Sequence, residues 1–150
     1  MKLTPEIHTA IDQSILCWLA TVSSDGTPNV SPKEMFTAFE DQIIIANIAS
    51  PQTVRNIRQQ PKVCLSFIDI LVQKGFQLKG QARIVEKGDP AFSAMEEVLL
   101  RMTGELFPFH SITTISVESA KPIIAPRYLL FPDTKEEDQV KRAKEAYGLA

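Results

Sequence analysis

The sequence predicts a mainly β protein, an antiparallel barrel or sandwich with flanking helices. Strand-like segments outnumber helix-like ones by about seven to four, and the first strand-like segments are joined by turns too short to hold a crossover helix. A doubly wound parallel sheet is not expected. Helices and strands do not alternate, and no Gly-x-Gly-x-x-Gly motif follows a strand.

The length of 150 residues suits a single domain over residues 1–150. A hydrophobic fraction of 44% excludes a wholly disordered chain. The 16 lysines and arginines stand against 18 aspartates and glutamates, so no basic excess points to nucleic acid as a partner. The chain has no apolar run long enough to span a bilayer and no signal peptide. We therefore expect a cytoplasmic protein without a membrane partner.

The side chains that usually carry chemistry are sparse. Cys17 and Cys64 lie singly in apolar runs and are expected to be buried, reduced thiols. His8 and His110 are too far apart in the sequence to predict a metal site. The chain also lacks a P-loop, a Gly-x-Ser-x-Gly elbow and a His-Glu-x-x-His motif. Catalytic residues are therefore not predicted.

The first predicted helix begins at Thr4, which suits an N-cap, with Pro5 at the first helical position. Ile7, Ile11 and Ile15 recur four residues apart and form one apolar stripe. We expect this helix to pack on the core through all three isoleucines.

Three strands follow as a predicted meander. The first covers 16–22 and ends in a turn whose Gly26 can adopt a positive φ. The second covers 29–39, although Pro32 interrupts it, and the third covers 42–48 and is apolar throughout. Their short connections predict that each strand pairs with the next.

The middle of the chain predicts a second helix and two strands. The helix begins at Ser50-Pro51 and stops before Pro61. The strands cover 62–69 and 75–85, with a loop between them. The sequence therefore feeds a strand directly into a helix, and the helix into another strand.

A third helix is expected to begin at Asp89-Pro90 and to end near Gly104. The spacing of its methionines and aromatic residues indicates packing rather than a cofactor motif. The residues expected to face the core are Phe92, Met95, Val98, Leu99 and Met102.

The last part of the chain predicts two strands, 111–117 and 123–131, followed by a highly charged helix over about 134–147. Thr134 and Glu137 have the spacing of a capping box at the start of this helix. The apolar content of the helix is low, so we expect it to pack along one narrow edge.

The start of the second helix is a candidate anion site. Free N–H groups and the positive end of the helix dipole meet there, and this arrangement favours phosphate. Ser50 and Thr53 add hydroxyl groups, and Arg55 and Arg58 lie on the first turns. Residues 30–85 carry seven basic and four acidic side chains, a local balance of +3 within a chain of net charge −2. This distribution also favours an anionic ligand.

These features are part of a wider resemblance. In order and spacing, the residues that carry it are Leu19-Ala20-Thr21-Val22, Asp25-Gly26, Pro28-Asn29-Val30-Ser31-Pro32-Lys33, Ala46-Asn47, Ser50, Val54-Arg55-Asn56-Ile57, Pro61, Val63 and Gly80-x-Ala82-x-Ile84-Val85. Over residues 10–88 the chain resembles the pyridoxamine 5′-phosphate oxidase-like, FMN-binding split-barrel family. The resemblance implies a single FMN-binding domain, a six- to seven-stranded antiparallel split barrel. It also implies a homodimer with two FMN sites at the subunit interface.

The resemblance also assigns expected roles to residues. Ser31 and Lys33 would lie beside the flavin ring and the ribityl chain, and Ala46-Asn47 would contact the flavin at the end of a strand. Gln77 and Lys79 would reach the flavin edge. Family members often place a basic residue where this chain has Gln52 or Thr53. The phosphate contacts implied here are Ser50, Thr53 and either Arg55 or Asn56.

The implied function is that of a small FMN-dependent oxidoreductase whose small-molecule substrate is unknown. The true oxidases carry C-terminal Trp and Arg elements that hold the vitamin substrate. This chain has a single tryptophan, Trp18, near its start. Pyridoxamine phosphate oxidation is therefore not expected. Two alternatives stay open: a non-catalytic flavin-binding, haem-binding or sensing module, and a deazaflavin-dependent reductase of the same fold.

Overall fold

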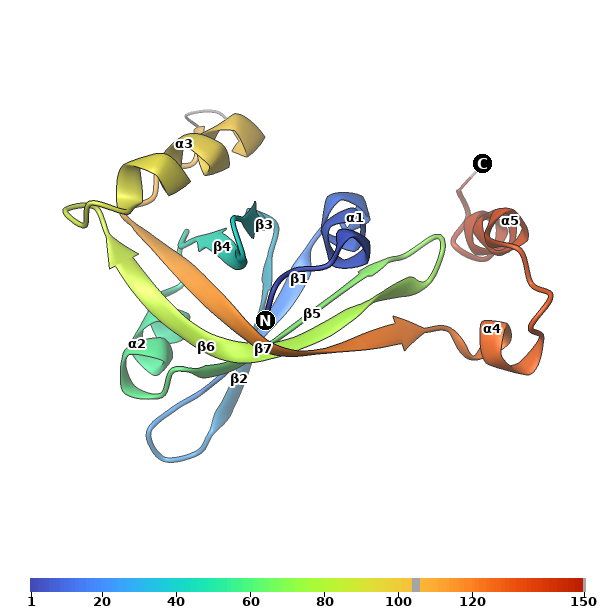
Figure 1. Ribbon diagram of the computed structural model, residues 1–150, viewed down its shortest axis with the longest axis horizontal. Coiled ribbons are helices and arrows are strands. Elements are labelled where there is room, and N and C mark those ends of the chain that lie inside the picture. The colour runs from blue at the N-terminus through green and yellow to red at the C-terminus, as the bar shows by residue number, and fades with distance from the viewer. Residues whose placement is uncertain (104–105, 150) are drawn as a thin grey trace.

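A curled antiparallel sheet of seven strands dominates the computed structural model, which describes residues 1–103 and 106–149 (Figure 1). The strand order is β2-β1-β5-β6-β7-β4-β3. The strands are β1 (Cys17–Val22), β2 (Pro28–Lys33), β3 (Phe36–Phe39), β4 (Gln42–Ala46), β5 (Lys62–Asp69), β6 (Lys74–Glu86) and β7 (Ser111–Ile124). The helices are α1 (Pro5–Gln13), α2 (Pro51–Gln59), α3 (Phe92–Thr103), α4 (Pro126–Leu130) and α5 (Glu136–Ala146). The predicted mainly β, antiparallel split-barrel class is confirmed.

The inner face of the curled sheet holds the main core. Phe67 is 2% exposed, and its ring centroid lies 5.8 Å from that of Phe36 and 6.4 Å from that of Phe76. The predicted Thr4 cap is present, since its Oγ1 accepts a hydrogen bond from the backbone N–H of Ile7 at 3.4 Å. Helix α1 closes this core with two of its isoleucines. A second apolar cluster lies between α3 and the β4–β7 side of the sheet.

The predicted meander is wrong in one respect. The segment 29–39 is two strands, β2 and β3, separated at Glu34-Met35. Strand β2 pairs with β1 and β3 pairs with β4, so the two lie at opposite edges of the sheet. A short connection between two segments does not show whether they pair as a hairpin or lie at opposite edges of the sheet.

The predicted strand 123–131 is also wrong. Strand β7 runs without a break from Ser111 to Ile124, and the chain then forms helix α4 with Pro126 at its first position. Strand β4 pairs with β7 only as far as Ser116. Pro122 is tolerated in the distal half of β7 because a proline fits an edge strand, where its missing N–H breaks no ladder.

Four smaller expectations on helices meet different outcomes. Ile15 lies beyond the end of α1 and is 68% exposed, so only Ile7 and Ile11 of the predicted stripe are buried. Met102 is also exposed. The other predicted core positions of α3 do face the core: Phe92, Met95 and Leu99 are buried, and Val98 is half-buried. The capping box is absent because the N-cap of α5 is Lys135, with no side-chain capping bond. The predicted helix end at Gly104 lies outside the described residues.

Both cysteines are free thiols. Cys17 is buried, and this burial raises the pKa of its thiol to about 12, so the group stays protonated and inert at neutral pH. Cys64 is only half-buried, so the expected burial is confirmed for Cys17 and wrong for Cys64. Within the described residues, no three His, Cys, Asp or Glu side chains gather as a metal site. None of the described helices is long and apolar enough to cross a lipid bilayer.

Candidate functional site

A buried ammonium group lies where the end of β2 meets the start of α2. The Lys33 side chain is only 7% exposed, and its Nζ donates a hydrogen bond to Oγ of Ser50. The Ser50 hydroxyl in turn donates to the backbone carbonyl of Ile48 at 3.0 Å. Ser50 is the N-cap residue of α2, but its side chain makes no capping bond to the helix. The first N–H groups of α2 therefore remain available to another acceptor.

The Lys33 charge has no carboxylate partner among the described residues. The ion pairs there join Arg58 to Glu86, Lys74 to Glu136, and two other exposed arginines to acids. Burial lowers the pKa of Lys33 from its ordinary value because the charged form loses hydration. A lone buried cation is costly unless a counter-charge approaches it. This position therefore favours an anionic ligand.

A second set of predicted residues fastens α2 to the sheet. Oγ of Ser31 lies 3.2 Å from Oγ1 of Thr53, and Nδ2 of Asn56 donates to Oγ1 of Thr21 at 3.0 Å. Thr53 and Asn56 are 2% and 1% exposed. These contacts hold the start of the helix in place beside Lys33. Thr21, which sequence reasoning did not select, is a threonine among the apolar residues of β1, and that polarity was its only signal.

On the helix surface, Gln52 continues this set outward. Its Nε2 donates to Oδ1 of Asn56 at 2.7 Å, and its Oε1 accepts from Nη1 of Arg55 at 3.0 Å. Arg55 and Gln52 are exposed. The hydrogen bonds from Arg55 through Gln52 to Asn56 thus link a solvent-exposed guanidinium to the buried contact between α2 and β1.

Two hollows flank the contact between Lys33 and Ser50. The first, of about 440 Å³, is lined by Lys33, Glu34 and Ala46, and the rest of its wall is apolar and formed by Pro32, Met35, Ile48, Met102 and Phe107. The second, of about 540 Å³, is lined by polar and basic side chains, among them Asn47, Ser50, Arg55, Arg58 and Ser111. We call the Lys33–Ser50 contact, the start of α2 and these two hollows the cradle. One side of the cradle is suited to a flat apolar group and the other to polar or anionic groups.

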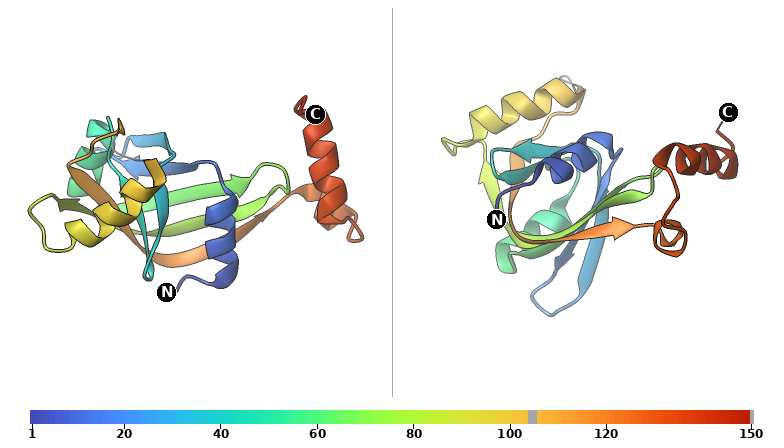
Figure 2. Two further views of the ribbon diagram at one scale, coloured as in Figure 1. Left: turned by 90° about the horizontal axis from the view of Figure 1, so that it is seen from above. Right: turned by 45° about the vertical axis from the view of Figure 1, so that its right-hand side comes forward.

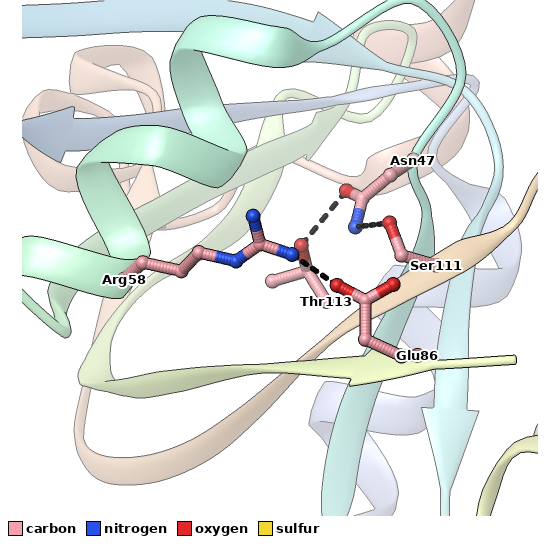
Figure 3. A network of polar contacts seen from close by, with 5 residues as sticks. All are labelled: Asn47, Arg58, Glu86, Ser111 and Thr113. Carbon is pink, nitrogen blue, oxygen red and sulfur yellow. Dashed lines mark hydrogen bonds and ion pairs between the residues drawn. The ribbon is translucent and has the colours of Figure 1, made fainter. Parts of the chain in front are cut away.

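Asn47 is held rigidly at the edge of the second hollow (Figure 3). Its Nδ2 donates to Oγ of Ser111 at 3.1 Å, and its Oδ1 accepts from Oγ1 of Thr113 at 2.8 Å. Arg58 and Glu86 form an ion pair beside them. The only sequence signal for Ser111 and Thr113 is that they alternate with the apolar Ile112 at the start of a mostly apolar strand.

Gln77 and Lys79 lie on the other face of the sheet. In the ladder, Leu19 is in register with Ser31 on one side and, through β5, with Leu78 on the other. Residues in register share a face, and neighbours along a strand point to opposite faces. Gln77 and Lys79, which flank Leu78, therefore point away from the face that carries Ser31. The structure brings the other nine predicted residues to the α2 side of the sheet and leaves these two apart.

Comparison with known proteins shows which family the chain belongs to. The family model described as pyridoxamine 5′-phosphate oxidase matches residues 3–118. The chain belongs to the pyridoxamine 5′-phosphate oxidase family. This match covers every residue of the cradle and ends within β7. None of the curated proteins is similar enough in sequence to match the chain.

Solved structures share the fold of this family member. HupZ of Group A Streptococcus is 26% identical, with a TM-score of 0.66, 79% of this chain and 91% of that chain covered. An FMN-binding protein from Syntrophomonas wolfei is 14% identical, with a TM-score of 0.64 and coverages of 79% and 84%. HutZ, a haem storage protein of Vibrio cholerae, is 20% identical, with a TM-score of 0.66 and coverages of 83% and 95%. The last two similarities concern the fold alone.

Proposed function

We propose that this pyridoxamine 5′-phosphate oxidase family member is an FMN-binding oxidoreductase. The observation that carries the proposal is the buried Lys33 ammonium, which has a serine hydroxyl and a helix start beside it and no carboxylate partner among the residues that the structure describes. FMN carries a phosphate and a flat apolar ring. The hydrogen-bond donors of Lys33, Ser50 and the start of α2 suit the phosphate, and the adjoining 440 Å³ hollow suits the ring.

In this proposal, each part of the cradle has one task. Lys33, Ser50 and the first N–H groups of α2 hold the phosphate. Met35, Ile48 and the apolar wall around them exclude water from the ring. When bound, FMN supplies the hydride or electron transfer, and the protein supplies position and electrostatics.

The remaining predicted residues support a homodimer. Gln77 and Lys79 cannot reach the cradle of their own chain, because they point from the opposite face of the sheet. That face is uncovered in one chain, and Trp18 on it is 49% exposed. We propose that a second copy covers this face, so that Gln77 and Lys79 serve the cofactor site of the partner.

The first experiment is an absorption spectrum of the purified protein, followed by titration of the ligand-free protein with FMN. We expect flavin bands or, after titration, about one FMN bound per chain, as judged by quenching of flavin fluorescence. Haem bands in the purified protein would contradict the choice of cofactor. A colourless protein that binds no added FMN would contradict the function as a whole.

The cradle predicts the effect of removing its hydroxyl groups. The double variant Ser50→Ala/Thr53→Ala should weaken FMN binding by about 2–4 kcal/mol. It removes the Ser50 hydrogen bond to the phosphate, worth about 1.5–3 kcal/mol, and the Thr53–Ser31 contact that holds the start of α2 in place, worth about 0.5–1.5 kcal/mol. Isothermal titration calorimetry measures the change, with Ser93→Ala on the exposed surface of α3 as the control. Unchanged affinity in the double variant would place the phosphate elsewhere.

A shared site also predicts complementation between two defective chains. We expect Lys33→Met and Gln77→Ala/Lys79→Ala to bind FMN poorly when each is alone. After the two are mixed and allowed to exchange subunits, each mixed dimer contains one intact site. Tight FMN binding should therefore return to about a quarter of the chains in an equal mixture. A mixture that binds no better than its components would contradict a site built from two subunits.

A further inference from the structure

The C-terminal arm, residues 125–149, lies at the distal end of the β5–β6–β7 ribbon, away from α2 and α3 (Figure 2). It comprises α4 and α5 and follows the part of the chain that the family model matches. Nothing in the proposed cofactor site involves the arm.

Polar contacts fix the arm to the turn between β5 and β6. The Tyr128 hydroxyl donates to the backbone carbonyl of Val72 at 2.7 Å. The Tyr147 hydroxyl donates to the carbonyl of Ile70 at 3.2 Å and accepts from Nε2 of Gln73 at 3.0 Å. Lys74 connects both helices, since its Nζ pairs with Oε1 of Glu136 in α5 at 2.8 Å and lies 4.4 Å from the ring centroid of Tyr128. The arm is thus held in a defined position.

Its outward surface is apolar at α4. None of the residues of this helix is buried, and Leu129 and Leu130 are 69% and 73% exposed. Phe131, which follows the helix, is 57% exposed. A rigid element that presents three adjacent large apolar side chains to solvent is typical of an interaction surface.

The charges of α5 indicate what covers this surface. Exposed acids occupy the first turn of α5, including Glu137 and Asp138, and the second half carries three exposed bases, Lys141, Arg142 and Lys144, against one exposed acid, Glu145. The exposed side of α5 lies opposite its buried stripe of Gln139 and Ala143. Two such helices placed antiparallel across a two-fold axis bring the acidic half of each against the basic half of the other. An anionic lipid surface would instead be repelled by the acidic half.

We propose that the C-terminal arm docks on the arm of a second copy of this chain. The apolar patch Leu129-Leu130-Phe131 supplies the buried surface, and the two antiparallel α5 helices supply the charge complementarity. Each contact occurs twice in such a symmetric pair, so the arm helps to hold the dimer together in addition to any contact between the sheets.

Charge reversal in the full-length protein tests the pairing. Glu137→Lys/Asp138→Lys makes the exposed side of α5 basic, and Lys141→Glu/Arg142→Glu makes it acidic. We expect each variant alone to raise the dissociation constant of the dimer at least tenfold in sedimentation velocity. An equal mixture of the two, or the quadruple variant that carries all four changes, should restore the wild-type dissociation constant. Glu40→Lys/Asp41→Lys changes the net charge equally at the β3–β4 turn and should have no effect.

The apolar patch is tested separately by Leu129→Ser/Leu130→Ser/Phe131→Ser, which should raise the dissociation constant about 100-fold. Far-UV circular dichroism verifies folding of each variant. Dimerisation unaffected by every arm variant would overturn the proposal, as would a protein that stays monomeric and binds anionic vesicles. FMN binding is measured in parallel. A wild-type protein that binds no FMN would contradict the proposed function, while the sedimentation data would still decide the role of the arm.

Discussion

Lys33→Met is expected to stabilise the ligand-free protein and at the same time to remove its affinity for FMN. Methionine fills a similar volume without a charge, so the variant avoids the cost of an unpaired buried ammonium, a gain of about 1–2 kcal/mol. The same change removes a charge-assisted contact to phosphate, worth about 1.5–3 kcal/mol, or roughly a 10- to 150-fold loss of affinity.

The stability difference should depend on pH. Burial lowers the folded-state pKa of Lys33 below its ordinary value of 10.5. Between these two pKa values the unfolded chain binds more protons than the folded chain, so the free energy of unfolding of the wild type rises with pH. Below the lowered pKa the full cost of the buried charge is present. The advantage of Lys33→Met should therefore be largest near neutral pH and shrink as pH approaches 10.5.

Urea unfolding of the two ligand-free proteins at neutral and alkaline pH measures the stability difference, and FMN titration measures affinity. Lys62→Met, at an exposed position at the start of β5, is the matched control and should change neither quantity much. A Lys33→Met protein that is less stable and binds FMN as tightly as wild type would show that Lys33 serves the fold rather than an anion.

Gly80→Ala is expected to lower the stability of the protein strongly. Gly80 lies at the irregularity in the β6–β7 ladder between Lys79 and Gly80, where the ribbon bends. A Cβ at this position would lie 2.1 Å from the backbone oxygen of Ser116, a distance that only movement of the strand can relieve. We expect a loss of about 3 kcal/mol or more, and a fall in Tm of roughly 6–12 °C.

Gly88→Ala is the control for this prediction. Nothing lies within 4 Å of a Cβ built on Gly88. This variant should therefore be as stable as the wild type in thermal unfolding followed by circular dichroism. A Gly80→Ala variant as stable as the wild type would mean that the close approach of β6 and β7 is not needed for the curl of the sheet.

Local sequence chemistry predicted where helix α2 begins. The Ser50-Pro51 signal located the start of α2, since an N-cap followed by a proline has few other conformations available to it. Lys33 was selected through the family resemblance, but its burial was not predictable. Whether a lysine near a strand end is buried depends on which elements pack over it, and here these are the start of α2 and the chain leaving β4.

For the C-terminal arm, too, the sequence predicted the local structure but not the part that depends on distant segments. Its charged helix was predicted within two residues at each end, because helix propensity and charge pattern are local properties. The apolar run before it was predicted as a strand. Residues 126–130 form a helix because no neighbouring strand is available to pair with them at the end of the ribbon, and Pro126 favours a helix start.

The sequence by itself determined the mainly β class and the positions of α1, α2, β1, β5 and β6, including the start of α2 at Ser50-Pro51. All of these depend on contacts between residues close in the chain. Only the tertiary structure decided that β2 and β3 lie at opposite edges, that Lys33 is buried with no carboxylate partner in the described part of the chain, and that Gln77 and Lys79 face away from the cradle. Those features depend on strand register and on packing between distant segments, which a pattern of single residues does not specify.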